Sequence, residues 1–172
     1  LVRHNSYLFK GTVEENLKMA KPDATKEEME AVLQKVNLLG FLQTQDGLQT
    51  RLLEKASNLS GGQCQRLVIA RALLRTDSAV YIFDEAASNI DVESEELIMN
   101  VIHELAKTKT VLLISHRLAN VVKSDKIYFL KDGEIKESGK HDELMSQNGA
   151  YRHLYESQMA LENYGKDGGA HE

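Results

Sequence analysis

Two short apolar runs, separated by a stretch with helical character, constrain the fold of this chain most. Residues 79–83 are continuously apolar and end in Asp84 and Glu85, and residues 110–115 (TVLLIS) form the second run. Such runs predict strands covered on both faces, which is typical of a parallel sheet. Residues 92–106 between them read as a helix, so we expect a right-handed βαβ crossover. The predicted fold class is therefore α/β with an open parallel sheet.

The rest of the chain is read from capping and turn signals. Thr25 and Glu28 form a capping box that starts a helix over about 26–37, and Ser60 is a good N-cap for a second helix. Asp132 and Gly133 predict a β-hairpin. The further expectations are an irregular segment over 1–16, a short helix over 38–42, a loop over 43–58, the second helix over 61–74, hairpin strands over 126–130 and 134–137, helices over 141–146 and about 151–163, and a frayed, flexible tail over 165–172.

Composition excludes several classes of protein. The length of 172 residues suits one domain, and the net charge of −5 argues against a nucleic-acid partner, whose phosphates need clustered Lys and Arg. No apolar run approaches the roughly 20 residues of a membrane helix, and the start shows no signal-peptide pattern. The only cysteine, Cys64, excludes an internal disulfide and indicates a reducing compartment. Its place at a helix start predicts a lowered thiol pKa at an incidental surface position.

Residues 58–63 (NLSGGQ) predict an anion site. A Ser-Gly-Gly turn that opens a helix presents unpaired backbone N–H groups and the positive end of a helix dipole, and phosphate is the usual ligand. A side chain on Gly61 or Gly62 would block close approach of the backbone to that ligand. The alternative is a plain helix cap at Ser60, with the glycines serving a tight turn.

Three polar side chains follow the two predicted strands. Asp84 and Glu85 end the first strand, and His116 comes directly after the second. Ligands of open α/β sheets bind beyond the carboxyl ends of the strands, so we expect these side chains near one site. Paired carboxylates suit Mg²⁺ binding and activation of water. The alternatives are that Asp84 and Glu85 cap the next turn and that His116 is structural.

The order of these motifs resembles the nucleotide-binding domain of ATP-binding cassette (ABC) transporters. The motifs are LSGGQ (59–63), VYIFDE (80–85), SNID (88–91) and ISHRL (114–118), and the likeness covers all but the tail. Residues 6–17 (SYLFKGTVEENL) resemble exporter-type members, which carry membrane helices in the same polypeptide. No G-x-x-x-x-G-K-[ST] phosphate loop is present. We therefore expect an N-terminally truncated, P-loop NTPase-like domain that lacks half of its ATP site.

The resemblance implies a role for each motif. In the family two domains pair head to tail, and the signature of one, here Leu59, Ser60, Gly61, Gly62 and Gln63, caps the γ-phosphate of ATP held by the other. Asp84 would hold Mg²⁺ through water, and Glu85 would polarise the attacking water. His116 would be the switch histidine that contacts γ-phosphate. Asp91 would cross the dimer interface, or cap the following helix, or do both.

Some positions depart from the family pattern. His4 stands where a glutamine normally contacts Mg²⁺ and water, and imidazole is a poorer ligand for that hard ion. Residues 50–56 (TRLLEKA) loosely match an exporter loop that precedes the signature, with Glu54 at the acidic position. Leu53 and Ala56 replace two glycines that are usual there. Tyr7, Leu8 and Phe9 resemble the surface that receives coupling helices from the membrane domain, with core anchoring as the alternative.

The expected protein is an ATPase of an ABC exporter that binds ATP and Mg²⁺ at the cytoplasmic face of a bacterial membrane. Residues 1–164 would be the partial nucleotide-binding domain, with a helical signature subdomain at about 17–75 and an α/β part with C-terminal helices at about 76–164. The expected partners are a second such domain and transmembrane coupling helices. The alternatives are a soluble cassette ATPase and a degenerate regulatory half.

Overall fold

The computed structural model describes residues 1–167, and the side chains of residues 1–161. The chain forms two compact units, Leu1–Ile114 and Ser115–Glu172. The flexible tail expected at 165–172 lies, from residue 168 on, outside the described residues, while residues 165–167 belong to the last helix. The expected boundary near residue 75, between a helical subdomain and an α/β part, stays a prediction.

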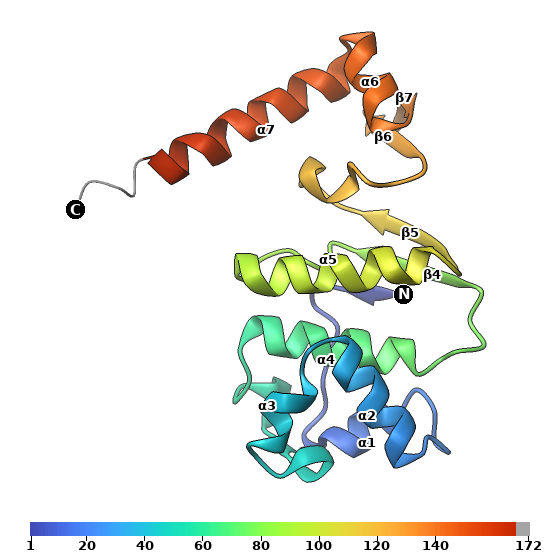
Figure 1. The fold of residues 1–172 in the computed structure, drawn as a ribbon, viewed down its shortest axis with the longest axis vertical. Helices are drawn as coiled ribbons and strands as arrows, with labels where there is room; N and C mark the ends of the chain where they lie inside the picture. Colours follow the sequence, from blue (N-terminus) through green and yellow to red (C-terminus); the bar gives the residue numbers. More distant parts are fainter. Residues whose placement is uncertain (168–172) are drawn as a thin grey trace. The chain divides into compact units, whose positions relative to one another are not determined.

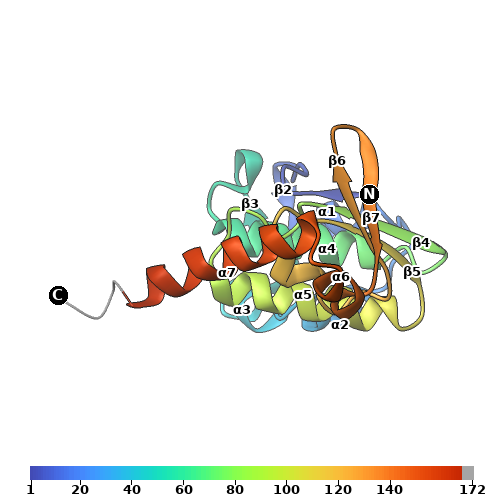
Figure 2. The same ribbon diagram turned by 90° about the horizontal axis from the view of Figure 1, so that it is seen from above.

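The first unit carries a three-stranded parallel sheet with β4 in the centre (Figures 1 and 2). Its strands are β1 (Val2–Arg3), β4 (Val80–Asp84) and β5 (Thr110–Ile114). Both β1 and β5 pair with β4 in parallel, and α5 (Val92–Ala106) forms the crossover from β4 to β5. The parallel sheet and its strand–helix–strand order are thus confirmed.

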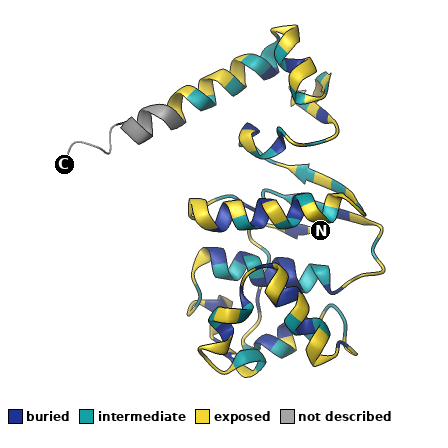
Figure 3. Ribbon diagram, viewed as in Figure 1, coloured by how far each residue is buried: buried dark blue, intermediate teal, exposed yellow. Residues whose placement is uncertain are grey.

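Only one face of this sheet is covered in the first unit. Tyr81 and Phe83 of β4 are buried, whereas Val80 of β4 and Leu112 and Ile114 of β5 are about half exposed (Figure 3). The register pairs Ile82 with Leu112 and Asp84 with Ile114, so these alternate residues share the second face. Within the first unit, the expectation that both faces are covered is met on one face only, because Leu112 and Ile114 on the other face are about half exposed.

Helix α4 (Gly61–Leu73) is the centre of the helical part of the first unit. Figure 1 shows it between α5 on one side and α1, α2 and α3 on the other. Leu67, Ile69 and Ala70 of α4 are fully buried, as are Leu33 of α2 and Leu17 of α1. The other helical and extended segments around it are α1 (Val13–Lys18), α2 (Lys26–Lys35), α3 (Leu39–Gln43), η1 (Gly47–Gln49) and η2 (Glu54–Ala56), with β2 (Gly11–Thr12) paired to β3 (Arg51–Leu52).

Two expectations about this part were wrong. The segment expected to be irregular over 1–16 contains β1, β2 and the start of α1, whose capping box joins Thr12 and Glu15. The segment expected to be a loop over 43–58 contains η1, β3 and η2. The capping box of α2, at Thr25 and Glu28, and the N-cap of α4 at Ser60 are confirmed, and the structure adds Gln63 as the reciprocal partner of Ser60.

The second unit contains an antiparallel hairpin and two helices. Strands β6 (Ile127–Lys131) and β7 (Glu134–Gly139) pair across the predicted Asp132-Gly133 turn, where both residues have positive φ. The unit also contains η3 (Leu118–Val121), α6 (His141–Gln147) and α7 (Ala150–Asp167). Tyr151 of α7 is fully buried and its hydroxyl lies 2.9 Å from Nδ1 of His141, which ties α6 to α7.

Candidate functional site

The carboxyl ends of β1 and β4 bring His4, Asp84 and Glu85 together. Arg3 is the register partner of Asp84, and its Nε lies 3.6 Å from Oδ2 of that carboxylate. The N–H of His4 donates to the carbonyl of Asp84 over 3.3 Å. Both Arg3 and Asp84 are partly exposed, so this ion pair is screened by solvent and leaves the carboxylate accessible.

Glu85 occupies a strained turn directly after β4. Its φ is 50°, which is the left-handed region that costs a residue with a Cβ roughly 1–2 kcal/mol. Neighbouring groups hold the turn: the N–H of Glu85 donates to Ile114 of β5 over 2.9 Å, and the Ser88 hydroxyl donates to the Glu85 carbonyl over 2.8 Å. Strain held in this way is common where a side chain must be aimed at a ligand.

The residues at the strand ends fit a partly hydrated Mg²⁺. Mg²⁺ prefers oxygen ligands and commonly takes one or two carboxylates, with water and substrate phosphate completing its shell. Asp84 offers such a carboxylate at a half-exposed strand end. Among the described residues no three metal-ligating side chains gather in one place, so a protein-only metal cage is not formed by this part of the chain.

The signature turn begins α4 with a reciprocal cap. The Ser60 hydroxyl accepts from the N–H of Gln63 over 3.2 Å, and the Gln63 side-chain oxygen accepts from the N–H of Ser60 over 2.9 Å. Ser60 and Gly61 are exposed, whereas Leu59 is partly buried against the hydrophobic core. Helix geometry leaves the N–H groups of Gly61 and Gly62 without intrahelical partners, so they remain suited to an anion.

The two glycines of the turn have different surroundings. A Cβ on Gly62 would lie 2.1 Å from the Ser94 hydroxyl oxygen and 2.6 Å from its Cβ, whereas a Cβ on Gly61 would meet nothing closer than 3.9 Å. Gly62 is therefore required for the packing of α4 against α5. A Cβ on Gly61 would make only ordinary contacts with Ile90 and Asn89, and the expectation that both glycines serve close approach to a ligand stays a prediction.

Asp91 caps α5 beside the signature turn. Its Oδ1 accepts from the N–H of Ser94 over 2.8 Å, and hydrogen bonds from Ser94 hold the pKa of the Asp91 carboxyl below its usual value. The same Ser94 is the residue that Gly62 packs against. The capping role expected for Asp91 is thus present, and the residue is exposed next to the turn.

Cys64 and Gln65 follow the signature turn, and neither residue is exposed. Gln65 is buried and its Nε2 donates to the carbonyl of Arg3 over 3.3 Å, which links α4 to the end of β1. No local pattern in the sequence indicates this link. Cys64 is half-buried, and burial raises the pKa of its thiol, so the expected lowering was wrong.

His116 belongs to the second unit, in the turn between β5 and η3. The Ser115 hydroxyl oxygen accepts from the N–H of Arg117 and also donates to the Arg117 carbonyl, with both distances 3.0 Å. Gln158 of α7 bonds to the backbone of the same turn. The His116 side chain is exposed, as a group that meets a ligand must be.

The segment after β1 presents two exposed aromatic rings. Tyr7 and Phe9 are nearly half exposed and pack edge to face with centroids 4.8 Å apart, while Leu8 between them is buried in the core. The expected surface therefore consists of Tyr7 and Phe9, and Leu8 is its anchor. Buried Asn16 accepts from the N–H of Phe9 and donates to the Phe9 carbonyl, and Arg71 donates to the Tyr7 carbonyl.

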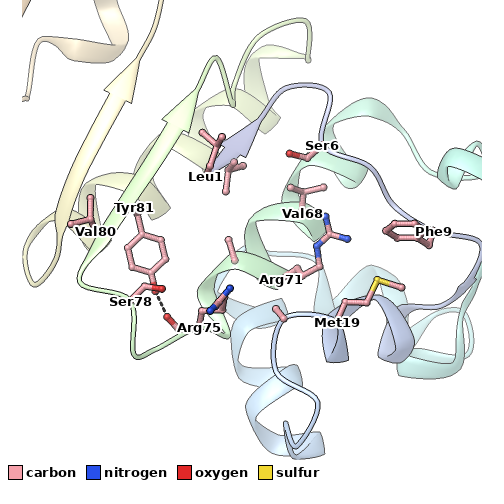
Figure 4. A pocket seen from close by; sticks show the side chains of 13 residues that line it. Leu1, Ser6, Phe9, Met19, Val68, Arg71, Arg75, Ser78, Val80 and Tyr81 are labelled. Carbon is pink, nitrogen blue, oxygen red and sulfur yellow. Dashed lines mark hydrogen bonds between the residues drawn. The ribbon is translucent and has the colours of Figure 1, made fainter.

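A hollow of about 360 Å³ adjoins this segment (Figure 4). Phe9, Met19 and Val68 line it together with Arg71 and Tyr81, so it combines apolar surface with a guanidinium group. Met19 is more than half exposed.

Among the helices of the described residues, none combines the length and the apolar character that crossing a bilayer requires.

Comparison with known proteins gives a consistent picture. The sequence profile of the family described as ABC transporter matches residues 1–88. An uncharacterized ABC transporter ATP-binding protein of Haemophilus influenzae is 52% identical over 162 residues, which are 94% of this chain and 29% of that protein. An ATP-dependent lipid A-core flippase of Vibrio vulnificus is 42% identical over 161 residues, which are 92% of this chain and 27% of that protein.

A solved structure has the same fold. The structure of a bacterial Atm1-family ABC exporter with ATP bound matches with a TM-score of 0.82 at 29% identity, over 91% of this chain and 28% of that chain. The chain thus spans less than a third of the length of these relatives.

Proposed function

Because this chain belongs to the ABC transporter family, we propose that it is the part of an exporter's nucleotide-binding domain that completes an ATP site on a second, paired domain. The observation that carries the proposal is the exposed Ser60-Gly61 turn at the start of α4, which Gly62 and Ser94 hold in place. An exposed helix N-terminus with a hydroxyl group and free N–H groups favours a phosphate ligand. The exporter and flippase relatives favour membrane export over the soluble alternative.

Ser60 and Gly61 would bind the terminal phosphate of ATP held by the partner domain. The Ser60 hydroxyl and the backbone N–H groups can donate to phosphate oxygens that gain charge during phosphoryl transfer. Gly61 is exposed and has no side chain, which favours close approach of a phosphate to the backbone N–H groups. Asp91, exposed beside the turn, would lie at the same domain interface.

Glu85 would orient and polarise the water that attacks the phosphate. The left-handed turn fixed by Ile114 and Ser88 projects this residue past the end of β4, where the substrate of an open α/β sheet binds. Bound Mg²⁺ would neutralise phosphate charge, with Asp84 contacting its hydration water. His116 would contact the same phosphate, and His4 would supply a weaker metal contact than glutamine does.

The intact protein would couple this reaction to movement of membrane helices at the cytoplasmic face of a bacterial membrane. Phe9 and Met19 line a partly apolar hollow. Both are exposed, as is Tyr7, which packs against Phe9, and this exposure supports contact with a protein partner. Arg71 adds a cation that an acidic or carbonyl-rich helix end would satisfy. Tighter closure of the paired domains around ATP than around ADP would supply the bias on the membrane part.

The proposal is tested by Glu85→Gln in the full-length protein reconstituted in lipid. Phosphate release should fall by ~10²–10⁴ because the water loses its base, while ATP stays bound and is trapped between the paired domains. Glu96→Gln, an exposed neighbour on α5, is the control for charge. Hydrolysis by Glu85→Gln at the wild-type rate would contradict the assignment, and loss of ATP binding would point to a folding defect in place of a catalytic one.

A further inference from the structure

The side chain of Gln158 on α7 binds the two backbone peptide groups that flank Arg117, directly after His116. Its Nε2 donates to the carbonyl of His116 over 2.7 Å, and its Oε1 accepts from the N–H of Leu118 over 2.9 Å. Since an amide donates only through nitrogen and accepts only through oxygen, the two bonds fix its orientation without ambiguity. The two residues it joins lie 42 and 40 positions away in the chain.

A second anchor holds the same turn from within. The Ser115 hydroxyl bonds to both backbone groups of Arg117. His116 therefore lies between Ser115, which closes the turn locally, and Gln158, which ties it to α7. The His116 side chain is exposed, whereas the direction of the His116 backbone carbonyl is set by the hydrogen bond from Gln158 of α7.

The second unit does not need the two hydrogen bonds of Gln158 in order to stay folded. Leu118 and Val121 of η3 are buried and supply apolar packing around the turn, and α7 contacts η3. Apolar contacts tolerate small rotations of a peptide, whereas two hydrogen bonds to one planar amide restrict its rotation. Gln158 therefore fixes the orientation of backbone groups in a turn that apolar contacts already hold in place.

We propose that Gln158 is a positioning residue, which aims His116 at the terminal phosphate by holding the His116 carbonyl and the Leu118 N–H. This inference rests on the proposed function, in which His116 contacts that phosphate. Phosphoryl transfer depends mostly on positioning, so a small rotation of the turn should lower turnover more than ATP binding.

The experiment measures steady-state ATP hydrolysis and hydrogen exchange of the 115–121 segment in the full-length protein. Gln158→Leu removes both bonds while keeping side-chain size and helix propensity similar. Gln158→Glu keeps an acceptor for the Leu118 N–H but loses the donor to the His116 carbonyl. Ser157→Ala is the matched control, because the Ser157 hydroxyl bonds only to the carbonyl of His153 within α7.

We expect Gln158→Leu to lower kcat by ~10- to 100-fold with little change in the ATP KM, and to speed exchange at Leu118. Gln158→Glu should lower kcat while Leu118 stays protected. Ser157→Ala should resemble the wild type. In a His116→Ala background, Gln158→Leu should cause no further loss, because two residues that act through one contact are not additive.

The outcomes separate the inference from the function beneath it. If His116→Ala hydrolyses ATP like the wild type, the role of His116 is wrong. If His116→Ala is impaired while Gln158→Leu has a normal kcat, the positioning role is overturned and that of His116 stands. An equal fall in kcat from Gln158→Leu with and without His116 would assign Gln158 a structural role only.

Discussion

At the scale of single residues, the two glycines of the signature turn have different neighbours. Gly62 lies against Ser94, so its missing side chain serves the packing of α4 and α5, while a Cβ on Gly61 would meet only ordinary contacts with Ile90 and Asn89. Both glycines look alike in the sequence because the neighbour of Gly62 is 32 positions away along the chain. Only the packing of the two helices shows that Gly62 is needed for the contact with Ser94.

Gly62→Ala should destabilise the domain by ~1–3 kcal/mol, because the added methyl group overlaps the Ser94 side chain. Gly61→Ala should not destabilise it, since the new Cβ meets only ordinary contacts and alanine favours a helix. Thermal unfolding of the purified protein measures both effects. Adding Ser94→Gly should restore much of the loss in Gly62→Ala, and a melt of Gly62→Ala equal to the wild type would contradict the packing assignment.

If Gly61 makes room for a phosphate, Gly61→Ala should lower ATP turnover in the full-length protein without lowering its melting temperature. The methyl group would stand between the backbone N–H groups and the anion. Turnover and melting are measured on the same preparation, so a loss of both together would argue for a folding effect.

At the scale of secondary structure, the sequence predicts elements that carry their own signals. The capping box at Thr25, the N-cap at Ser60 and the apolar runs of β4 and β5 were read correctly to within a few residues. Helix α1 was missed although Thr12 and Glu15 form the same capping box, because its six residues are too few to show a helical stripe. Strands β2 and β3, of two residues each, have no alternation to read.

The site could be predicted only in part for a similar reason. Asp84, Glu85 and the Ser60 turn follow recognisable motifs, whereas Gln65, Asn16 and Gln158 act through bonds to distant backbone groups that no local pattern records. The loop before the signature, residues 50–56, keeps a backbone feature although its sequence departs from the family pattern. Ala56 has a φ of 53°, so the left-handed conformation that glycine favours is kept at this position without glycine.

Asn16→Leu should destabilise the first unit by ~1–3 kcal/mol or more, because the N–H and carbonyl of Phe9 and the carbonyl of Thr12 would lose a buried partner. Asn58→Ala is the control: Asn58 bonds to two backbone groups, compared with three for Asn16, but it is exposed and water can replace it. Denaturant unfolding should show a smaller loss for Asn58→Ala. Equal losses would mean that burial of Asn16 contributes nothing.

At the scale of the whole molecule, the first unit leaves part of its sheet exposed, and the sequence contains no phosphate loop. Leu112 and Ile114 of β5 are 50% and 46% exposed on the face opposite α5. The chain also spans less than a third of its relatives. A site that needs groups from elsewhere agrees with the proposal that ATP is bound between paired domains.

The isolated 172-residue chain should therefore have negligible ATPase activity and should associate through its exposed apolar strand. Light scattering after size exclusion should show species larger than the monomer, and the double substitution Leu112→Thr, Ile114→Thr should reduce them while keeping β propensity. ATP-saturable hydrolysis by the isolated chain that Glu85→Gln abolishes would refute the need for a partner.

The most direct measurement is a structure of the full-length Glu85→Gln protein with ATP and Mg²⁺ bound. The account predicts the Ser60 hydroxyl and the Gly61 N–H within about 3.2 Å of the terminal phosphate of ATP that is held by the opposite nucleotide-binding domain. A closed, ATP-loaded assembly in which Ser60 and Gly61 face bulk solvent, away from any nucleotide, would contradict it.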